Sequence, residues 1–400
     1  MHTLINDTDR LIDQLVAKEE ARLIEIRRDI HAHPEIGFDV ERTAGVVARE
    51  LTRLGIEHKT GIGRTGVLGI IKGGRPGPTL LLRADMDALP IIEETELPYA
   101  STVKGRMHAC GHDIHTSTLI GVAAVLKEIA PRLAGTVKLM FQPAEETPDS
   151  GAKAMIEDGI LDGVDMALGF HNHPDEPTGM FSYIEGNANG SCDEFEITVY
   201  GRSGHAAHPD QAVDPIVASA HLVLALQTIV SRETNPMHPA VLTIGAIHAG
   251  DTYNVIPEMC KLIGTVRCQD SATRRAIDEA IHRQCRALED MLRVKSNVNY
   301  MRNLPSLHHD NTIVSVTMAA IADHFGQDAV MKRAPSLGAE DFSLVGEKVP
   351  AFQLGIGSQI PGRNDFLHNG DYQPDETCIG LGVTALSCAT VRLLEEVGQK

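Results

Sequence analysis

The arrangement of apolar residues changes twice along this chain, near residues 190 and 304, and that change limits the folds it can adopt. Before residue 190, short runs rich in leucine and β-branched residues alternate with segments of helical periodicity, as in an α/β sheet whose functional site lies at strand ends. The order then becomes β-α-β-β-α-β, that of a ferredoxin-like module. The first pattern resumes at Pro305. We therefore predict an α/β domain over residues 1–190 and 304–400, interrupted by an inserted domain over residues 191–303.

The individual elements follow from the period of the apolar residues. In the α/β part we expect helices over 11–30, 41–54, 116–129 and 152–158, and strands over 66–71, 79–83, 136–141 and 164–170. In the inserted part we expect strands near 195–199, 241–248, 259–267 and 294–300, and helices over 214–231 and 272–292. A last helix is expected over 377–396.

The excess of acidic over basic residues argues against two classes of partner. With 54 acidic residues against 36 basic ones, the formal net charge is -18, so the phosphates of nucleic acid or of an anionic membrane would be repelled. No apolar run approaches the length of a membrane span, and the N-terminus lacks the features of a secretory signal. The seven cysteines are scattered and odd in number, which favours a reducing, cytoplasmic location over a disulfide framework.

The densest group of candidate metal ligands lies in the segment Met107–His115, next to an apolar helix. It holds three histidines, a cysteine and an aspartate, and thiolate and imidazole are good ligands for zinc and its neighbours. The spacing does not match a zinc finger, so a structural zinc site is disfavoured. A helix N-terminus capped by Asp113, with incidental histidines, is the plain alternative.

Acidic residues and histidines also follow several of the predicted strands. Glu145 and Glu146 come after the strand that ends at Phe141, and adjacent carboxylates can divide the work, one binding a metal and the other taking a proton from water. Taken singly, such groups are solvated acids or structural histidines. Several of them at strand ends together favour a metal site. The other groups are Gly169–Pro174, Phe366–Tyr372 and Arg83–Pro90, whose acids could orient ligand imidazoles.

Together and in this order, the motifs resemble the aminoacylase and carboxypeptidase family of metal-dependent peptidases. The branch to which they are most similar is that of hippurate hydrolase and the hydrolases of indole-acetyl amino acids. The similarity runs nearly end to end, from His31–Glu35 to Leu367–His368 and beyond. It implies a zinc-peptidase-like catalytic domain with a central mixed sheet, and an inserted ferredoxin-like domain that acts as a lid and dimerisation module.

The resemblance also implies a ligand set for two divalent ions per subunit, of manganese, zinc, cobalt or nickel. Cysteine would bridge the two ions. The implied ligands are Cys110, His112, Glu146, His171 and His368.

Further roles follow from the resemblance. Glu145 would be the general base, and Asp87 would support a ligand imidazole. His205, from the inserted domain and acting across a dimer, would stabilise the oxyanion. The substrate would be a small N-acyl amino acid. Residues expected to face it are Asn254, Arg267 and the loop around Gly338.

The implied activity is hydrolysis of the amide bond of hippurate-like, N-acetyl or indole-acetyl amino acids by a homodimer or homotetramer. Two segments depart from the pattern of the branch and leave the acyl preference open: Thr147–Gly151, where many relatives carry a glycine-rich run, and the polar segment Glu185–Gly190. A dipeptidase or carboxypeptidase of the same family is the alternative. A non-catalytic metal-binding protein or a redox metalloprotein is disfavoured because Glu145 stands beside the ligand set. The other six cysteines are expected to be buried apolar residues.

Overall fold

The computed structural model describes residues 7–397, which divide into two compact units. Unit 1 comprises residues 1–186, 308–334 and 344–400, and unit 2 comprises residues 187–307 and 335–343. The short segment 335–343, which contains Gly338, thus groups with unit 2. Nothing in the apolar pattern of the sequence predicts that these few residues return to unit 2.

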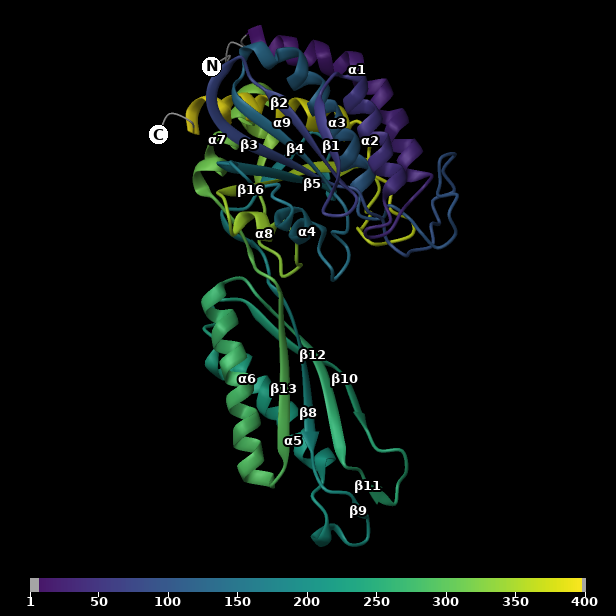
Figure 1. The fold of residues 1–400 in the computed structure, drawn as a ribbon, viewed down its shortest axis with the longest axis vertical. Helices are drawn as coiled ribbons and strands as arrows, with labels where there is room; N and C mark the ends of the chain where they lie inside the picture. Colours follow the sequence, from purple (N-terminus) through teal and green to yellow (C-terminus); the bar gives the residue numbers. More distant parts are fainter. Residues whose placement is uncertain (1–6, 398–400) are drawn as a thin grey trace. The chain divides into compact units, whose positions relative to one another are not determined.

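Unit 1 is built on an eight-stranded mixed sheet (Figure 1) with the strand order β1-β2-β4-β3-β5-β16-β6-β15. The four central strands, β4, β3, β5 and β16, run parallel to one another. The antiparallel pairs lie toward the two edges. The strands are β1 Glu57–Ile62, β2 Gly66–Lys72, β3 Arg75–Asp85, β4 Ala134–Gln142, β5 Met166–Pro177, β6 Phe181–Tyr183, β15 Val330–Lys332 and β16 Ala351–Gln359. The predicted α/β class with a central mixed sheet is confirmed.

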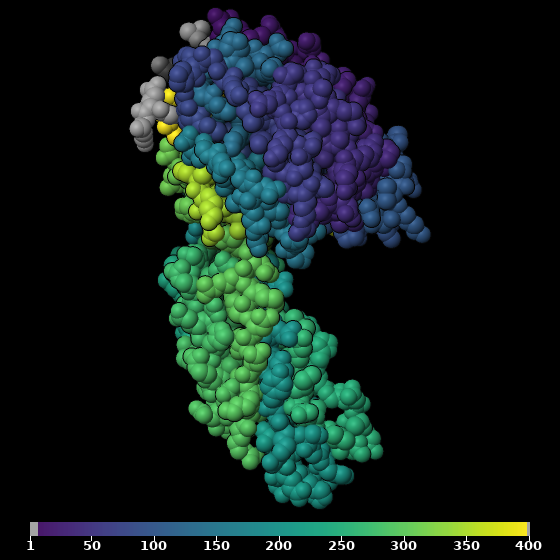
Figure 2. All heavy atoms as spheres, viewed as in Figure 1, coloured from purple at the N-terminus to yellow at the C-terminus, as the bar shows by residue number. Residues whose placement is uncertain are grey.

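Helices complete unit 1 because its central strands are apolar on both faces and must be covered. Helix α3 is buried almost all round, since α1, α9 and the sheet all pack against it. The purple and blue N-terminal segments make up most of the visible face of this unit (Figure 2). The helices are α1 Asp7–His31, α2 Glu41–Arg53, α3 His112–Ile129, α4 Gly151–Glu157, α7 Asn311–Phe325, α8 Ser343–Gly346 and α9 Cys378–Glu396.

Unit 2 contains a four-stranded antiparallel sheet in the order β10-β12-β8-β13. Helices α5 and α6 pack against each other and against the sheet. The elements are β8 Cys192–Tyr200, α5 Pro215–Thr228, β10 Ala240–Ala249, β12 Met259–Cys268, α6 Ser271–Leu292 and β13 Lys295–Leu304. This is the β-α-β-β-α-β order that the sequence predicts. Two small strand pairs are added: β9 Gly204–His205 with β11 Val255–Ile256, and β7 Gly186–Asn189 with β14 Leu307–His309.

Two helical segments, residues 215–233 and 378–396, are long and apolar enough to cross a membrane by length and composition. On those criteria the expectation that no apolar run reaches such a length is wrong. Most of the second segment is buried inside unit 1, as expected of a core helix. The first segment packs one face on the sheet of unit 2.

Helix α3 begins at His112, four residues earlier than predicted, because Gly111 takes a left-handed conformation with φ of 87° just before it. This backbone conformation suits glycine, which has no Cβ. A Cβ at Gly111 would lie 2.7 Å from Tyr372 Oη and closer still to Asn172 Oδ1. The glycine therefore lets the start of α3 approach β5, in which Asn172 lies.

Gly111→Ala is expected to destabilise unit 1 by about 2–5 kcal/mol, the sum of left-handed strain and steric overlap. Gly105→Ala is the matched control, because Gly105 also has a positive φ, 78°, but nothing lies within 4 Å of the position that a Cβ would take there. The control should cost only the strain, about 1–2 kcal/mol. Urea unfolding of both variants gives the comparison. Equal losses of unfolding free energy in the two variants would mean that the close approach at Gly111 adds nothing to the cost of the substitution.

Candidate metal centre

The five side chains expected to bind metal come together in unit 1, at the carboxyl ends of its parallel strands. Cys110 and His112 stand at the start of α3, His171 lies in β5, and Glu146 follows β4. His368 lies in the loop after β16. Ligand sites of open α/β sheets form at this edge because the loops that follow parallel strands converge there.

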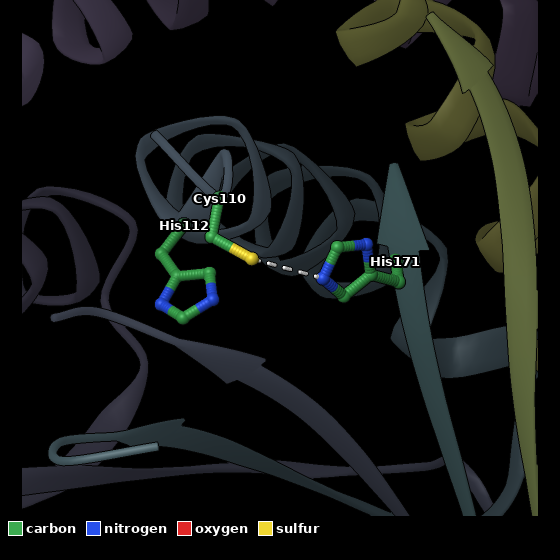
Figure 3. Close-up of side chains that lie close together, drawn as sticks. All are labelled: Cys110, His112 and His171. Carbon is green, nitrogen blue, oxygen red and sulfur yellow. Dashed lines mark hydrogen bonds between the residues drawn. The ribbon is translucent and has the colours of Figure 1, made fainter. Parts of the chain in front are cut away.

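Cys110, His112 and His171 form the inner part of the cluster. The Cys110 sulfur points toward the ring of His171 in β5, and the ring of His112, at the start of α3, lies beside Cys110 (Figure 3). Cys110 Sγ lies 3.4 Å from His171 Nε2, and one ligand atom of each of the three residues lies within 4.8 Å of the others. A sulfur and two imidazole nitrogens at this spacing suit zinc and its neighbours.

Glu146 and His368 form the outer part of the cluster, which also includes Cys110. His368 Nε2 lies 3.1 Å from Glu146 Oε1, and His112 Nε2 lies 3.9 Å from the same oxygen. The backbone N–H of His368 donates to the carbonyl of Ala109 at 2.8 Å. His368 itself has a φ of 63°, a conformation that is uncommon outside glycine and tends to cluster at functional sites.

Asp87 connects the acidic loop to the ligand helix. Its carboxylate accepts hydrogen bonds from the backbone N–H groups of Glu145 at 3.0 Å and Glu146 at 3.1 Å. The same carboxylate lies 3.4 Å from His112 Nδ1. One buried side chain therefore fixes the loop and orients the imidazole, leaving His112 Nε2 on the side of Glu146.

Asp85 and His115 belong to the same buried environment. Both lie in segments that the sequence singles out, Asp85 among the acids expected to orient ligand imidazoles and His115 among the histidines of Met107–His115, but the sequence does not pair them. Asp85 Oδ1 lies 2.6 Å from His115 Nδ1, and Asp85 Oδ2 lies 3.6 Å from His112 Nε2. His115 Nε2 accepts a hydrogen bond from the backbone N–H of Asn172. Because both of its ring nitrogens are engaged, His115 supports the neighbouring β5 segment. Its position one helical turn after His112 is the signal that could have indicated it.

The donor atoms fit a divalent cation. Both ring nitrogens of His112 are buried beside carboxylates, Nδ1 at 3.4 Å from Asp87 and Nε2 at 3.6 Å from Asp85, but neither makes a hydrogen bond among the described residues. A cation bound at Nε2 would satisfy this nitrogen. Burial holds the pKa of His171 well below its usual range, so its imidazole is neutral and can ligate. Burial and the charge of Glu146 raise the pKa of the Cys110 thiol. A divalent cation would supply the positive charge that favours the thiolate.

Glu145 lies beside the ligands and is half-buried. A carboxylate oxygen of Glu145 lies within 4.8 Å of ligand atoms of both His112 and Glu146. Its backbone is fixed by Asp87. The structure thus brings the residue expected to be the general base to the edge of the expected ligand set.

The four remaining residues expected at the site belong to unit 2. His205 is exposed in the β9–β11 pair, opposite Val255, and its Nδ1 accepts from the backbone N–H of Ala207. Asn254 is next to it, since its carbonyl accepts from the N–H of Ala206. Their contribution to the site stays a prediction. The same holds for Arg267, in β12 opposite Val241, and for Gly338, whose carbonyl accepts from the N–H of Gly190.

Comparison with known proteins agrees with this geometry. Residues 81–389, most of the chain, match the profile of peptidase family M20/M25/M40. The chain belongs to this peptidase family. The family resemblance expected from the sequence is therefore confirmed, and with it the enzyme class, a hydrolase of amide bonds.

Relatives of this M20 peptidase match it over most of their length. The N-acetyl-L-cysteine deacetylase of Bacillus subtilis is 40% identical over 360 residues, which are 90% of this chain and 85% of that protein. Hippurate hydrolase of Campylobacter jejuni is 38% identical over 352 residues, 87% of this chain and 90% of that protein. Thermostable carboxypeptidase 1 of Saccharolobus solfataricus is 36% identical over 381 residues, 94% of this chain and 96% of that protein.

A solved structure from the same family shares the fold. It is the structure of a Bacillus subtilis protein described as a dinuclear metal-binding peptidase of family M20. It is 35% identical in sequence and has a TM-score of 0.85, and the match covers 95% of this chain and 99% of that chain.

Proposed function

We propose that this chain hydrolyses the amide bond of N-acyl amino acids and releases a carboxylic acid and an amino acid. The observation that carries the proposal is the cluster in unit 1, where a general-base candidate, Glu145, lies against a set of sulfur, imidazole and carboxylate ligands. The relatives named N-acetyl-L-cysteine deacetylase and hippurate hydrolase support the substrate class.

The proposed cofactor is a pair of divalent ions. The residues that would hold them are Cys110, His112, Glu146, His171 and His368. When bound, two such ions polarise a carbonyl oxygen and lower the pKa of water. The relative described as a dinuclear metal-binding peptidase supports a pair rather than a single ion.

The proton transfers are assigned to Glu145. Its carboxylate takes a proton from the attacking water and returns it to the nitrogen of the leaving amine, so that the carboxylate is regenerated in each cycle. Asp87 keeps the Glu145 backbone in place for both steps through the N–H···O bond of 3.0 Å. The proposed role of Asp87 is thus to position the base, not to exchange protons.

Three polar residues of unit 2 are proposed to recognise the substrate. Arg267 would pair with the free carboxylate of the amino-acid half, for which a planar guanidinium is well suited. His205 would donate to the oxyanion that develops on the carbonyl. Asn254, its neighbour in the β9–β11 region, would donate to the substrate through its amide.

The experiment is a release assay on the metal-loaded enzyme with N-acetyl, N-benzoyl and indole-acetyl amino acids, with simple dipeptides alongside. We expect chelator-sensitive release from one acyl class. Cleavage of free peptides alone would favour the carboxypeptidase or dipeptidase alternative, which the Saccharolobus relative represents. Metal binding without cleavage of any substrate would favour a non-catalytic metal-binding protein.

We further propose that the chain forms a homodimer, or a homotetramer built from such dimers, through unit 2. Strand β10 is a ten-residue edge strand of its sheet, and exposed edges of this length invite pairing with another strand. Its Ile247 side chain is 54% exposed, and Leu224, on the adjacent helix α5, is 71% exposed. Packing against a second copy would pair the open edge of β10 and bury these apolar side chains.

The double variant Leu224→Asp/Ile247→Lys is expected to be monomeric in sedimentation equilibrium, because it places charges on the proposed interface. Met291→Lys is the matched control: Met291 is exposed to a similar degree, 59%, but lies on α6. The control should keep the oligomeric state of the wild type. A monomeric wild type with full activity would contradict both the dimer and the action of His205 across it.

The cytoplasm is the proposed location. All seven cysteines are free thiols, as expected in a reducing compartment.

A further inference from the structure

A second group of candidate metal ligands lies in unit 1, on residues that the proposed reaction does not use. Asp9 lies in α1, His324 in α7 and Cys388 in α9. One ligand atom from each lies within 4.8 Å of the other two. Helix α9 packs against both α1 and α7, so residues more than 300 positions apart in sequence meet at this point.

The spacing of these atoms matches tetrahedral zinc. Zn–S and Zn–N bonds of about 2.3 and 2.0–2.1 Å at a tetrahedral angle place sulfur and nitrogen about 3.6 Å apart. Cys388 Sγ lies 3.6 Å from His324 Nδ1 and 3.9 Å from Asp9 Oδ1. The sulfur–nitrogen distance thus equals the tetrahedral value, and the sulfur–oxygen distance exceeds it by only a few tenths of an ångström.

The imidazole of His324 is also oriented for metal binding. Asp13, one turn after Asp9 on the same face of α1, places Oδ1 3.0 Å from His324 Nε2. A hydrogen bond from Nε2–H to this carboxylate leaves the lone pair of Nδ1 directed toward Cys388. Metal-ligating histidines are held in this way by a carboxylate on their other nitrogen.

Chemistry and access favour a soft divalent ion here. A thiolate from Cys388 and a carboxylate from Asp9 would neutralise two positive charges, and thiolate selects zinc over magnesium or calcium. Cys388 is buried, whereas Asp9 and Asp13 are partly exposed, which gives the ion a path of entry along α1. The fourth position would be filled by water.

We propose that Asp9, His324 and Cys388 form a zinc-type site, separate from the proposed catalytic centre, that joins α1 to α7 and α9. The site is structural: it crosslinks the N-terminal helix to the helices that cover the sheet. Burial and the charges of Asp9 and Asp13 raise the pKa of the Cys388 thiol, so binding of the ion displaces one proton from the sulfur.

Metal content and cobalt absorption test the proposal. The wild-type protein, loaded with Zn²⁺ and freed of excess, should contain one more ion per chain than Cys388→Ser. Loaded with Co²⁺, the wild type should show an extra thiolate-to-cobalt charge-transfer band in the difference spectrum against Cys388→Ser. The contribution of Cys110 is common to both proteins and cancels in that difference.

Three further variants make the result decisive. Cys378→Ser removes another buried thiol from α9 and should keep the wild-type content. Asp13→Asn should bind the additional Zn²⁺ about 10–100-fold more weakly. Asp9→Asn leaves the buried thiol and imidazole in place and should lower the content even where Cys388→Ser fails to fold. Equal metal content and identical cobalt spectra in the wild type, Cys388→Ser and Asp9→Asn would overturn the proposal, whether or not the enzyme cleaves N-acyl amino acids.

Discussion

Replacing Glu145 by glutamine is expected to lower kcat by about 10²–10⁴-fold, the usual contribution of a general base, while leaving the metal content unchanged. Glutamine has nearly the shape of glutamate but cannot take a proton. The contact that fixes this residue runs from its backbone N–H to Asp87, so the loop should keep its conformation. The loss should therefore lie in kcat, with little change in KM.

The neighbouring residue provides the matched comparison. Glu146→Gln alters a carboxylate whose Oε1 lies 3.1 Å from His368 Nε2, and it should reduce metal affinity as well as turnover. Metal analysis and steady-state kinetics on the two variants separate base from ligand. If both variants lost metal equally, or if Glu145→Gln kept its activity, the assignment of the two carboxylates would be wrong.

Cys110→Ala is expected to release metal and to lower turnover by at least about 10²-fold. Its sulfur belongs to both parts of the cluster: one group contains Cys110, His112 and His171, and the other contains Cys110, Glu146 and His368. A ligand shared in this way would bridge the two ions. Its removal should lower the affinity for both ions. We expect a loss of about 10–100-fold or more, as is typical when a metal site is disturbed.

Metal content, activity and inactivation by thiol reagents check this prediction. Cys285→Ala is a suitable control, because Cys285 is a buried thiol in the core of unit 2. The control should keep its metal and its activity. Full activity in Cys110→Ala would show that the sulfur is not a required ligand, and the bridging role would have to be abandoned.

The strongly periodic elements of the fold could be predicted from the sequence, and weakly patterned ones could not. Helices α1, α2 and α6 lie within a few residues of their expected bounds, because their apolar faces recur at helical spacing. Strand β1, Glu57–Ile62, escapes prediction because its residues are mostly polar and exposed at the sheet edge. The start of α3 depends on the left-handed Gly111, which an apolar pattern does not reveal.

Residues of the candidate site could be predicted from the sequence for a different reason. Histidine, cysteine and paired acids are chemically distinctive and follow recognisable strands, so Cys110, Glu145 and His171 stand out in the sequence. Their mutual distances depend on strand order, which the sequence does not state. His205 and Asn254 are brought near each other by a two-residue strand pair and the adjoining Ala206–Asn254 hydrogen bond, elements too short to show a periodic pattern. Only the family resemblance points to them.

The burial of His112 and Cys110 at the start of a core helix has a consequence for the protein in the cell. The imidazole nitrogens of His112 make no hydrogen bond within the described part of unit 1, and ions that bind only the folded state stabilise it by mass action. Proteases remove the unfolded fraction continuously. Scarcity of the metal would therefore shorten the lifetime of the protein, so that supply of the ion sets the abundance of the enzyme together with its activity.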